Sequence, residues 1–131
     1  MKAIQLILLS FFLFMGLHLD AHAGEKSDTK IYVNLWQNKL YLIKEGKVTE
    51  QYPIAPGSAS TPTPVGHFKV VKKDKHWGSG FGTRWLGLNV PWGQYGIHGT
   101  NRPYLVGQSV SHGCIRMRNR DVEKLFPKVP V

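Results

Sequence analysis

The chain has 131 residues and a formal net charge of +9, and these figures together with its composition exclude several classes of protein. It is long enough for one domain, too short for a barrel enzyme, and at 42% apolar residues too apolar for a disordered chain. A single cysteine excludes an intrachain disulfide framework and a cluster of cysteine ligands. Fourteen glycines and eight prolines favour a loop-rich β protein over a helix bundle.

Residues 1–23 have the three parts of a secretory signal peptide. Lys2 supplies the positive start, residues 4–15 form the apolar stretch, and Ala-His-Ala at 21–23 is a small-x-small cleavage site before Gly24. The apolar stretch is shorter than the roughly 20 residues that cross a bilayer, so we expect cleavage and no stable membrane insertion afterwards. Export argues against a nucleic-acid partner for this basic chain and favours an anionic membrane face or wall polymer.

The first part of the mature chain is predicted to form a β-meander. Residues 24–30 are polar, and we expect a flexible segment there. Alternating apolar, β-branched and aromatic residues then predict strands, joined by short turns, over 31–36, 39–44 and 48–54. Residues 56–66 contain three prolines and two glycines, which predicts an extended, turn-rich loop.

Strands continue in the second half of the chain and are followed by one helix. The strands are predicted over 67–72, 85–90 and 95–98, loops over 73–84 and 99–109, and an extended segment over 110–117. A single helix is predicted over 119–126, with Asn119 as its N-cap and Pro127 directly after its end. The pattern therefore indicates a mainly β domain with one short helix.

The only cysteine lies in the segment 111–116, whose sequence is Ser-His-Gly-Cys-Ile-Arg. If this segment is extended, His112, Cys114 and Arg116 face the same side. An imidazole and a guanidinium beside a thiol create a positive potential, which we expect to lower the pKa of Cys114 and to favour the nucleophilic thiolate. The alternative is that Cys114 is only a small buried apolar side chain.

A nucleophilic cysteine needs a general base, and two histidines are candidates. His112 lies two residues before Cys114, whereas His98 ends a predicted strand in the segment Gly-Ile-His-Gly-Thr at 96–100. A metal site of His98, His112 and Cys114 is a rival interpretation, because catalytic zinc has three protein ligands. The spacing of these residues matches no common zinc motif, so covalent catalysis is favoured.

The segments around His98 and Cys114 resemble the signature of the L,D-transpeptidase (YkuD-type) catalytic domain family. That signature is a histidine, a spacer, and then Ser/Thr-His-Gly-Cys. Two further segments are similar to the family, namely Thr-Pro-Thr-Pro-Val-Gly-His-Phe at 61–68 and Asn-Arg-Asp-Val at 119–122. The resemblance covers residues 31–131, which we therefore expect to be the catalytic domain.

The resemblance implies a role for each matching position. Cys114 would be the nucleophile and His98 its base, with the backbone carbonyl of Gly99 orienting the imidazole. Catalytic support or an oxyanion hole would come from His112, Gly113, Gly99 and Ser111. Arg116 would place the substrate, and we add Trp92, Tyr95 and Thr100 as further candidates for substrate binding. Neither a metal nor a cofactor is implied.

The resemblance also implies a fold and a reaction. The fold would be β-sandwich-like and mostly antiparallel, with a short helix after the cysteine. The reaction would be 3→3 cross-linking of bacterial peptidoglycan stem peptides in the periplasm or cell wall, through a Cys114 thioester on a tetrapeptide donor, and carbapenems would label Cys114. Water as acceptor would give an L,D-carboxypeptidase, and loss of turnover would leave a wall-binding module. The family's domain usually ends in a further strand, which we expect to be missing because the sequence stops at Val131.

Two groups of side chains outside these motifs have less specific interpretations. The aromatic residues Trp77, Trp85 and Tyr104 could line a glycopeptide groove with Trp92 and Tyr95, although packing in the core and loops is the simpler interpretation. The cations Lys72, Lys73, Lys75 and Arg84 form a basic stretch that is either solvated surface or attracted to an anionic wall polymer. The sequence does not predict an oligomeric state.

Overall fold

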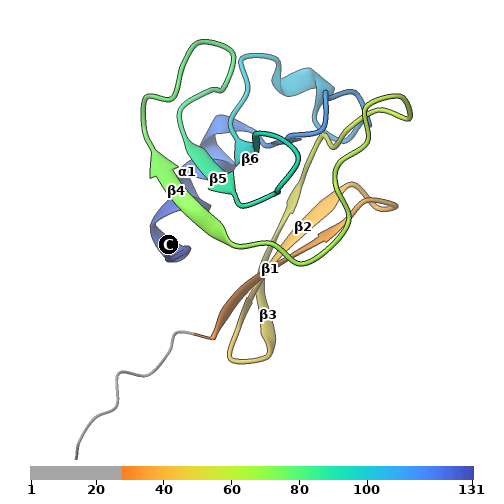
Figure 1. The fold of residues 1–131 in the computed structure, drawn as a ribbon. Helices are drawn as coiled ribbons and strands as arrows, with labels where there is room; N and C mark the ends of the chain where they lie inside the picture. Colours follow the sequence, from red (N-terminus) through yellow and green to blue (C-terminus); the bar gives the residue numbers. More distant parts are fainter. Residues whose placement is uncertain (1–27) are drawn as a thin grey trace, which may run out of the picture.

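Two β-sheets and a C-terminal helix make up residues 28–131, the part of the chain that the computed structural model describes (Figure 1). The predicted signal peptide at 1–23 lies outside the described residues. Sheet A contains, in spatial order, β1 (Thr29–Asn34), β2 (Lys39–Lys44) and β3 (Lys47–Pro53). Sheet B contains, again in order, β4 (Val70–Asp74), β5 (Trp85–Leu88), β6 (Tyr95–His98) and β7 (Ile115–Arg116). The predicted mainly β fold with one short α-helix is confirmed.

Sheet A is the predicted meander, with antiparallel pairing throughout. Thr29 and Lys30, expected in a flexible segment, already pair with β2. The first strand ends two residues earlier than predicted, because the Asn34 carboxamide accepts the backbone N–H groups of Trp36 and Gln37 and turns the chain. Trp36 is therefore not a strand residue, and its side chain is 98% exposed.

The strand β4 is displaced from its predicted position, since it starts at Val70 instead of residue 67 and ends at Asp74. Before β4, the Asn89 carboxamide accepts the backbone N–H of Lys69 at 2.7 Å and replaces a ladder bond. After it, the Asp74 carboxylate accepts the backbone N–H of His76 at 2.7 Å and turns the chain. Hydrogen bonds to side chains thus determine where β4 begins and ends, and the alternation of apolar residues does not reveal these positions.

The β6–β7 pair is parallel and joins segments that are distant in the chain, with Ile97 opposite Ile115 and His98 opposite Arg116. The predicted extended segment 110–117 forms a strand only near its end, because Gly113 adopts φ +120° and interrupts the alternation. The connection between the two strands contains a short 3₁₀ helix, η1 (Pro103–Leu105).

The helix α1 (Asn119–Leu125) lies where a helix was predicted, but its N-cap is Arg118 and not Asn119. Asn119 is already helical, and its carboxamide accepts the backbone N–H of Thr83 at 3.1 Å. The N-cap prediction is therefore wrong, because this side chain ties the helix to the loop before β5. Pro127 does not end all helical structure, since the chain continues as the 3₁₀ helix η2 (Phe126–Lys128).

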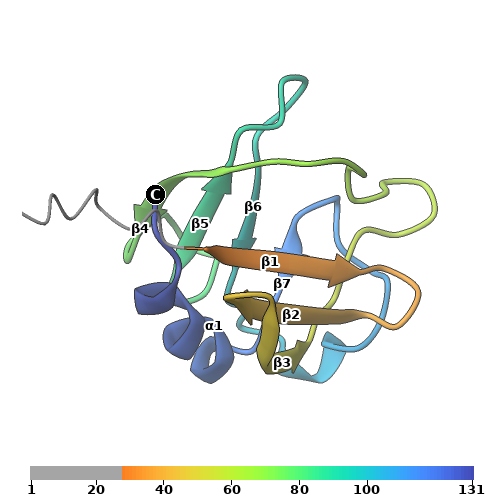
Figure 2. The same ribbon diagram turned by 90° about the horizontal axis from the view of Figure 1, so that it is seen from below.

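The core lies between the two sheets and α1. Figure 2 shows the strands of sheet A crossing those of sheet B, with α1 beside both sheets. Burying one large apolar side chain completely stabilises a fold by about 1.5–3 kcal/mol. The buried apolar residues include Leu40 and Leu42 of β2, Leu86 of β5, Ile97 of β6, Ile115 of β7, and Val122 and Leu125 of α1. No helix in residues 28–131 is long and apolar enough to cross a bilayer.

Candidate active site

The pairing of β6 with β7 places His98, at the end of β6, and Cys114, directly before β7, on the same side of sheet B. Ile97 of β6 and Ile115 of β7 lie opposite each other, and both are buried in the core. Because side chains alternate along a strand, His98 points to the other side of the sheet. Cys114 directly precedes β7, and its thiol lies beside Gly96 of β6 on that same side. This side, which also carries Trp85 and Arg116, is called the outer face below.

The Cys114 thiol lies against the backbone of β6, where the N–H of Gly96 donates a hydrogen bond to it. Gly96 precedes His98 by two residues and therefore lies on the same side of the strand. Arg116 is paired with His98 across β6 and β7, and its charge acts on both the thiol and the imidazole. The parallel pair thus gathers Cys114, His98 and Arg116, three residues that the sequence predicts for the site.

His98 is only 3% exposed, and three groups hold its imidazole. The Gly99 carbonyl oxygen lies 2.6 Å from Nδ1, which is the contact that the family resemblance implied. Trp85 stacks on the ring with centroids 5.8 Å apart and planes inclined by 25°, and Phe81 meets it edge-on at 5.1 Å. With the Nδ1 proton donated to Gly99, Nε2 is the nitrogen that can accept another proton.

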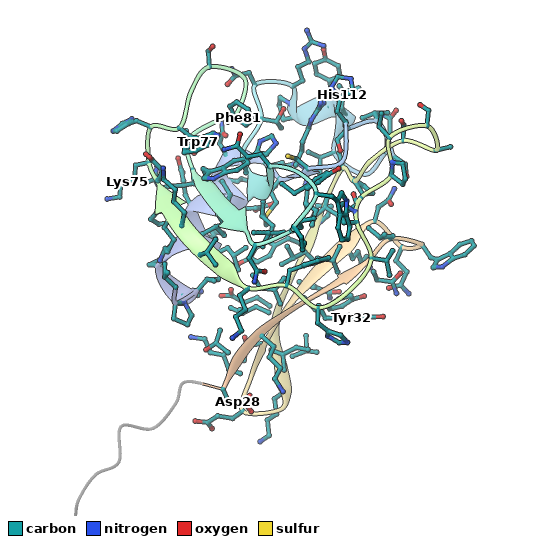
Figure 3. All side chains as sticks on the ribbon, in the orientation of Figure 1. Asp28, Tyr32, Lys75, Trp77, Phe81 and His112 are labelled. Carbon is teal, nitrogen blue, oxygen red and sulfur yellow. The ribbon has the colours of Figure 1, made fainter. Side chains whose placement is uncertain are left out.

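Paired glycines explain how an indole can lie flat on the outer face. Gly87 of β5 and Gly96 of β6 are opposite each other in the sheet. A Cβ at Gly96 would lie 2.6 Å from Cη2 of Trp85, and a Cβ at Gly87 would lie 2.9 Å from its Nε1. Trp85 in turn stacks on Trp77 with centroids 4.9 Å apart. Figure 3 shows Trp77 and Phe81 close together on the loop before β5, so one loop covers the imidazole.

Ser111 organises the turn that leads into Cys114. Its hydroxyl donates to the Cys114 carbonyl oxygen at 2.5 Å and accepts the backbone N–H of Gly113 at 3.0 Å. Its own carbonyl accepts the Thr61 hydroxyl at 2.8 Å, which attaches the proline-rich loop to this turn. Gly113 has φ +120°, and a Cβ there would lie 2.7 Å from Cε1 of Tyr95, so the turn requires glycine.

Burial raises the pKa of the Cys114 thiol, which corrects the expectation of a lowered value. The Gly96 N–H and the Arg116 charge act in the opposite direction, but removal of the thiolate from water is the stronger effect. The positive neighbours are visible in the sequence, whereas desolvation depends on the fold. His112, the other expected neighbour, is exposed and lies in the bend at residues 112–114, which is not extended. Cys114 is therefore a neutral thiol in the resting protein near neutral pH.

Burial lowers the pKa of the His98 imidazole, and the Arg116 charge lowers it further. Backbone hydrogen bonds to Gly99 and Phe81 favour the protonated ring, but they only partly offset the burial. The imidazole is therefore also neutral near neutral pH. A neutral imidazole on the same side of the sheet as a neutral thiol can act as a general base by taking the thiol proton as the sulfur attacks.

A groove of about 580 Å³ lies beside the turn that carries Cys114. Residues 60–65 of the proline-rich loop form part of its wall, and three predicted site residues, Trp92, Tyr95 and His112, form the rest. Trp92 is 65% exposed and meets Phe68 edge-on. The lining does not include Cys114 or His98, but the Tyr95 ring packs on Gly113, the residue before the cysteine.

The other predicted site residues lie outside the groove. Thr100 is buried, and its hydroxyl accepts the backbone N–H of Arg102 at 3.0 Å in the turn after β6. Arg116 is half-buried on the outer face, and its backbone pairs with Ala55. Within residues 28–131, no three histidine, cysteine or acidic side chains lie close enough to hold a metal ion, so His98, His112 and Cys114 form no such group.

Three contributors to the site were not predicted from the sequence: the Trp85 stack, the Gly96 donor and the Phe81 edge contact. The positions of Trp85 and Gly96 could have been predicted from the sequence. Strands β5 and β6 form a hairpin in which Trp85 pairs with His98 and Gly87 with Gly96. Counting outward from the turn at residues 89–94 would have found both pairs. Phe81 lies in a glycine-rich loop whose path no local pattern predicts.

These features define a small two-sheet β domain with a histidine at the end of β6 and a cysteine directly before the neighbouring strand β7. Residues 28–131 match the family model of the L,D-transpeptidase catalytic domain, YkuD. The chain is 45% identical to the Bacillus licheniformis protein named L,D-transpeptidase YkuD over 101 residues, which cover 77% of this chain and 60% of that protein. The chain therefore belongs to the YkuD family of L,D-transpeptidase catalytic domains.

Solved structures agree with this family membership. The catalytic domain of the E. faecium L,D-transpeptidase acylated by ertapenem matches with a TM-score of 0.66 and 29% identity, covering 82% of this chain and 94% of that domain. The Ldtfm–avibactam carbamoyl enzyme matches with a TM-score of 0.67 and 30% identity, covering 79% of this chain and 46% of that one. The chain thus spans nearly the whole of a solved catalytic domain, but 60% of the length of the Bacillus relative.

Proposed function

We propose that the chain is a cysteine-dependent L,D-transpeptidase that forms 3→3 cross-links between peptidoglycan stem peptides. The observation that carries this proposal is the parallel β6–β7 pair, which sets Cys114 against the backbone two residues before His98. The Gly99 carbonyl holds the imidazole in one tautomer, as a general base requires. Family membership supports the same reaction class. The predicted signal peptide supports a place of action in the periplasm or cell wall.

The first half-reaction forms a thioester. The Cys114 sulfur attacks the carbonyl carbon that joins the L-centre of the third residue to the terminal D-residue of a tetrapeptide. Nε2 of His98 takes the thiol proton during this attack, because the resting thiol is neutral. The carbon–nitrogen bond then breaks, His98 gives the proton to the leaving amine, and the donor peptide stays on the sulfur as an acyl group.

The second half-reaction transfers the acyl group. An amine of a neighbouring stem peptide attacks the thioester carbonyl and gives one proton to His98. The carbon–sulfur bond breaks, and the sulfur recovers that proton as the new amide joins the two stems. Water in place of the amine would hydrolyse the thioester and make the chain an L,D-carboxypeptidase.

The oxyanion of each tetrahedral intermediate needs hydrogen-bond donors. The Gly113 N–H already donates to Ser111, so we assign the first donor to the backbone N–H of Cys114. Arg116 adds a positive potential at the same place. His112 and Tyr95, on the groove beside this turn, would contact the stem peptide.

Two inhibitor-bound relatives support a covalent mechanism. One similar catalytic domain is acylated by ertapenem, and another similar enzyme is carbamoylated by avibactam. Both are reactions of an enzyme nucleophile with an electrophilic carbonyl carbon. We infer that Cys114 supplies the nucleophile here, since it is the only cysteine in the chain.

A disaccharide tetrapeptide tests the proposal. The protein should release the terminal D-residue and produce a dimer whose fragmentation in the mass spectrometer locates the new bond between two third residues. The Cys114→Ala variant should give neither product. Release without a dimer would replace the transpeptidase proposal with the carboxypeptidase one, and a folded chain without turnover would be a wall-binding module. Products from the variant would rule out the mechanism.

A further inference from the structure

A hollow with basic walls lies at the edge of sheet B, apart from both the groove and the cysteine. This hollow, which we call the basic hollow, measures about 350 Å³. Its walls include Lys75, His76, Thr83 and Arg84. The edge strand β4 leads into it and carries two further cations, Lys72 and Lys73. Figure 3 shows Lys75 on the side of Trp77 and Phe81 that faces away from His112, so the hollow and the groove occupy different sides of the outer face.

The cations around the hollow have no acidic partners. Within residues 28–131 the ion pairs are Lys30 with Asp28, Arg120 with Asp121 and Lys128 with Glu50, and none of them includes a cation of this region. The segment 72–84 holds three lysines and one arginine but a single carboxylate, Asp74. That carboxylate accepts the His76 backbone N–H. The four cations therefore outnumber the single carboxylate, and the segment keeps a net positive charge.

Packing holds these cations in place without neutralising them. The Lys72 ammonium lies 4.3 Å from the centroid of the Trp77 ring. The Lys73 ammonium lies 4.5 Å from the Phe126 ring and donates to the Val129 carbonyl at 2.8 Å. The Arg84 guanidinium lies 5.5 Å from the same phenyl ring. A binding partner would therefore meet cations whose side-chain freedom is already reduced.

Two polar atoms in the walls of the hollow lack partners. The Thr83 hydroxyl and Nε of Arg84 are buried, and neither makes a hydrogen bond within the described residues. Buried polar groups are normally paired, and each unpaired one is costly. Thr83 and Arg84 both line the hollow, together with Lys75 and His76. An anion that accepts several hydrogen bonds is the ligand that fits the charged donors of these walls, the Lys75 ammonium and the Arg84 guanidinium.

We propose that the basic hollow binds a phosphate group of an anionic phosphodiester polymer. Phosphate suits a compact site with an arginine and a lysine, because its oxygens accept several hydrogen bonds at once. A polymer suits the distribution of charge, since Lys72 and Lys73 are fixed separately along an edge strand and do not converge on one point. Binding here would hold the protein on the polymer, while the groove on the other side remains open.

Fluorescence anisotropy with labelled poly(glycerol phosphate) tests this site. Lys75→Gln and Arg84→Gln should each weaken binding about tenfold, the effect of losing one hydrogen bond to a charged group. The matched controls are Lys39→Gln and Lys47→Gln, which remove the same charge from exposed positions of sheet A. The controls should leave the affinity within about twofold, because distant exposed charges are screened by salt. Added inorganic phosphate should compete and should shift the amide resonances of residues 78–84.

Three results would overturn the site. Equal weakening by the controls would reveal a general attraction to the net charge of +9. Equal affinity for polygalacturonate, a carboxylate polymer, would reject phosphate as the ligand group. Tighter binding to phosphatidylglycerol vesicles would point to a membrane. Because Lys75 is exposed, Lys75→Gln should fold normally. This variant alone tests the site if Arg84→Gln proves unstable. Acylation of Cys114 by ertapenem should be unchanged in Lys75→Gln, which separates this proposal from the proposed function.

Discussion

Sheet A and sheet B contribute to the same core, but only sheet B carries chemistry on its other side. Sheet A is a meander of sequence neighbours, and its contribution is apolar packing through Leu40 and Leu42. Sheet B packs Leu86 and Ile97 inward and holds the cysteine and histidine outward, across a parallel pair of distant segments. The site thus depends on tertiary pairing, whereas sheet A depends on local hairpins.

This difference between the sheets shows that a well-packed core can hold residues in conformations and environments that are unfavourable by themselves. His98 is buried against aromatic rings, and Gly113 has a backbone conformation that other residues rarely adopt. The pKa of Cys114 is raised because its thiolate is poorly solvated. Such departures from ordinary preferences are typical of functional sites. In sheet A, Asn38 and Glu45 also have a positive φ, but each lies in a hairpin turn, where the turn alone requires it.

The largest effect on the chemistry of sheet B is expected from a substitution of His98, the proposed general base. His98→Gln should slow the acylation of Cys114 by ertapenem about a hundredfold or more, because no other group takes the thiol proton. Stopped-flow fluorescence gives this rate, and thermal unfolding shows whether the variant is folded. A folded variant with the original rate would exclude His98 as the base.

A core substitution in sheet A should lower stability but leave the acylation rate unchanged. Leu40→Ala removes a fully buried side chain and should lower the free energy of unfolding by about 2–5 kcal/mol. The ertapenem rate of the protein that remains folded should not change. Urea unfolding combined with the same acylation assay checks both statements, and a rate that falls with stability would contradict the separation of the sheets.

A substitution in the Trp85 recess should affect stability and chemistry together. Gly96→Ala would place a Cβ 2.6 Å from Cη2 of Trp85 and should cost about 1–3 kcal/mol of stability through overpacking. The displaced indole should also disturb His98 and slow acylation. Gly107→Ala is the control, because Gly107 has φ +102° but no atom near its missing side chain. It should lose stability through backbone strain alone and keep its acylation rate. Equal rates in both variants would refute the positioning role of Trp85.

The smallest effect concerns pH. The Arg116 charge lowers the pKa of both Cys114 and His98, so Arg116→Gln should raise both. The pH profile of thiol alkylation by iodoacetamide should therefore move to higher pH, since more alkaline solution is needed to form the thiolate. Titration of the His98 ring protons by NMR should show a shift in the same direction. A move of either profile to lower pH would contradict the assigned electrostatics.

The sequence predicted the parts of this structure that depend on near neighbours. The meander followed from alternating side chains and short turns. Residue types and spacing proposed Cys114 with either His98 or His112, and the family resemblance implied His98. The raised pKa of Cys114 could not be predicted, because it arises from burial that the sequence does not display. The same holds for Asn119, which satisfies the ordinary N-cap preference but binds a loop that lies 36 residues away in the chain.

The most direct test of the central claim is the mass of the intact protein after incubation with ertapenem, followed by peptide mapping. One adduct per chain is predicted, located on Cys114 at the end of the turn that Ser111 organises, and Cys114→Ser should carry none. An adduct that persists in Cys114→Ser, or a folded unmodified protein that acquires no adduct, would contradict the assignment of the outer face of sheet B as the active site.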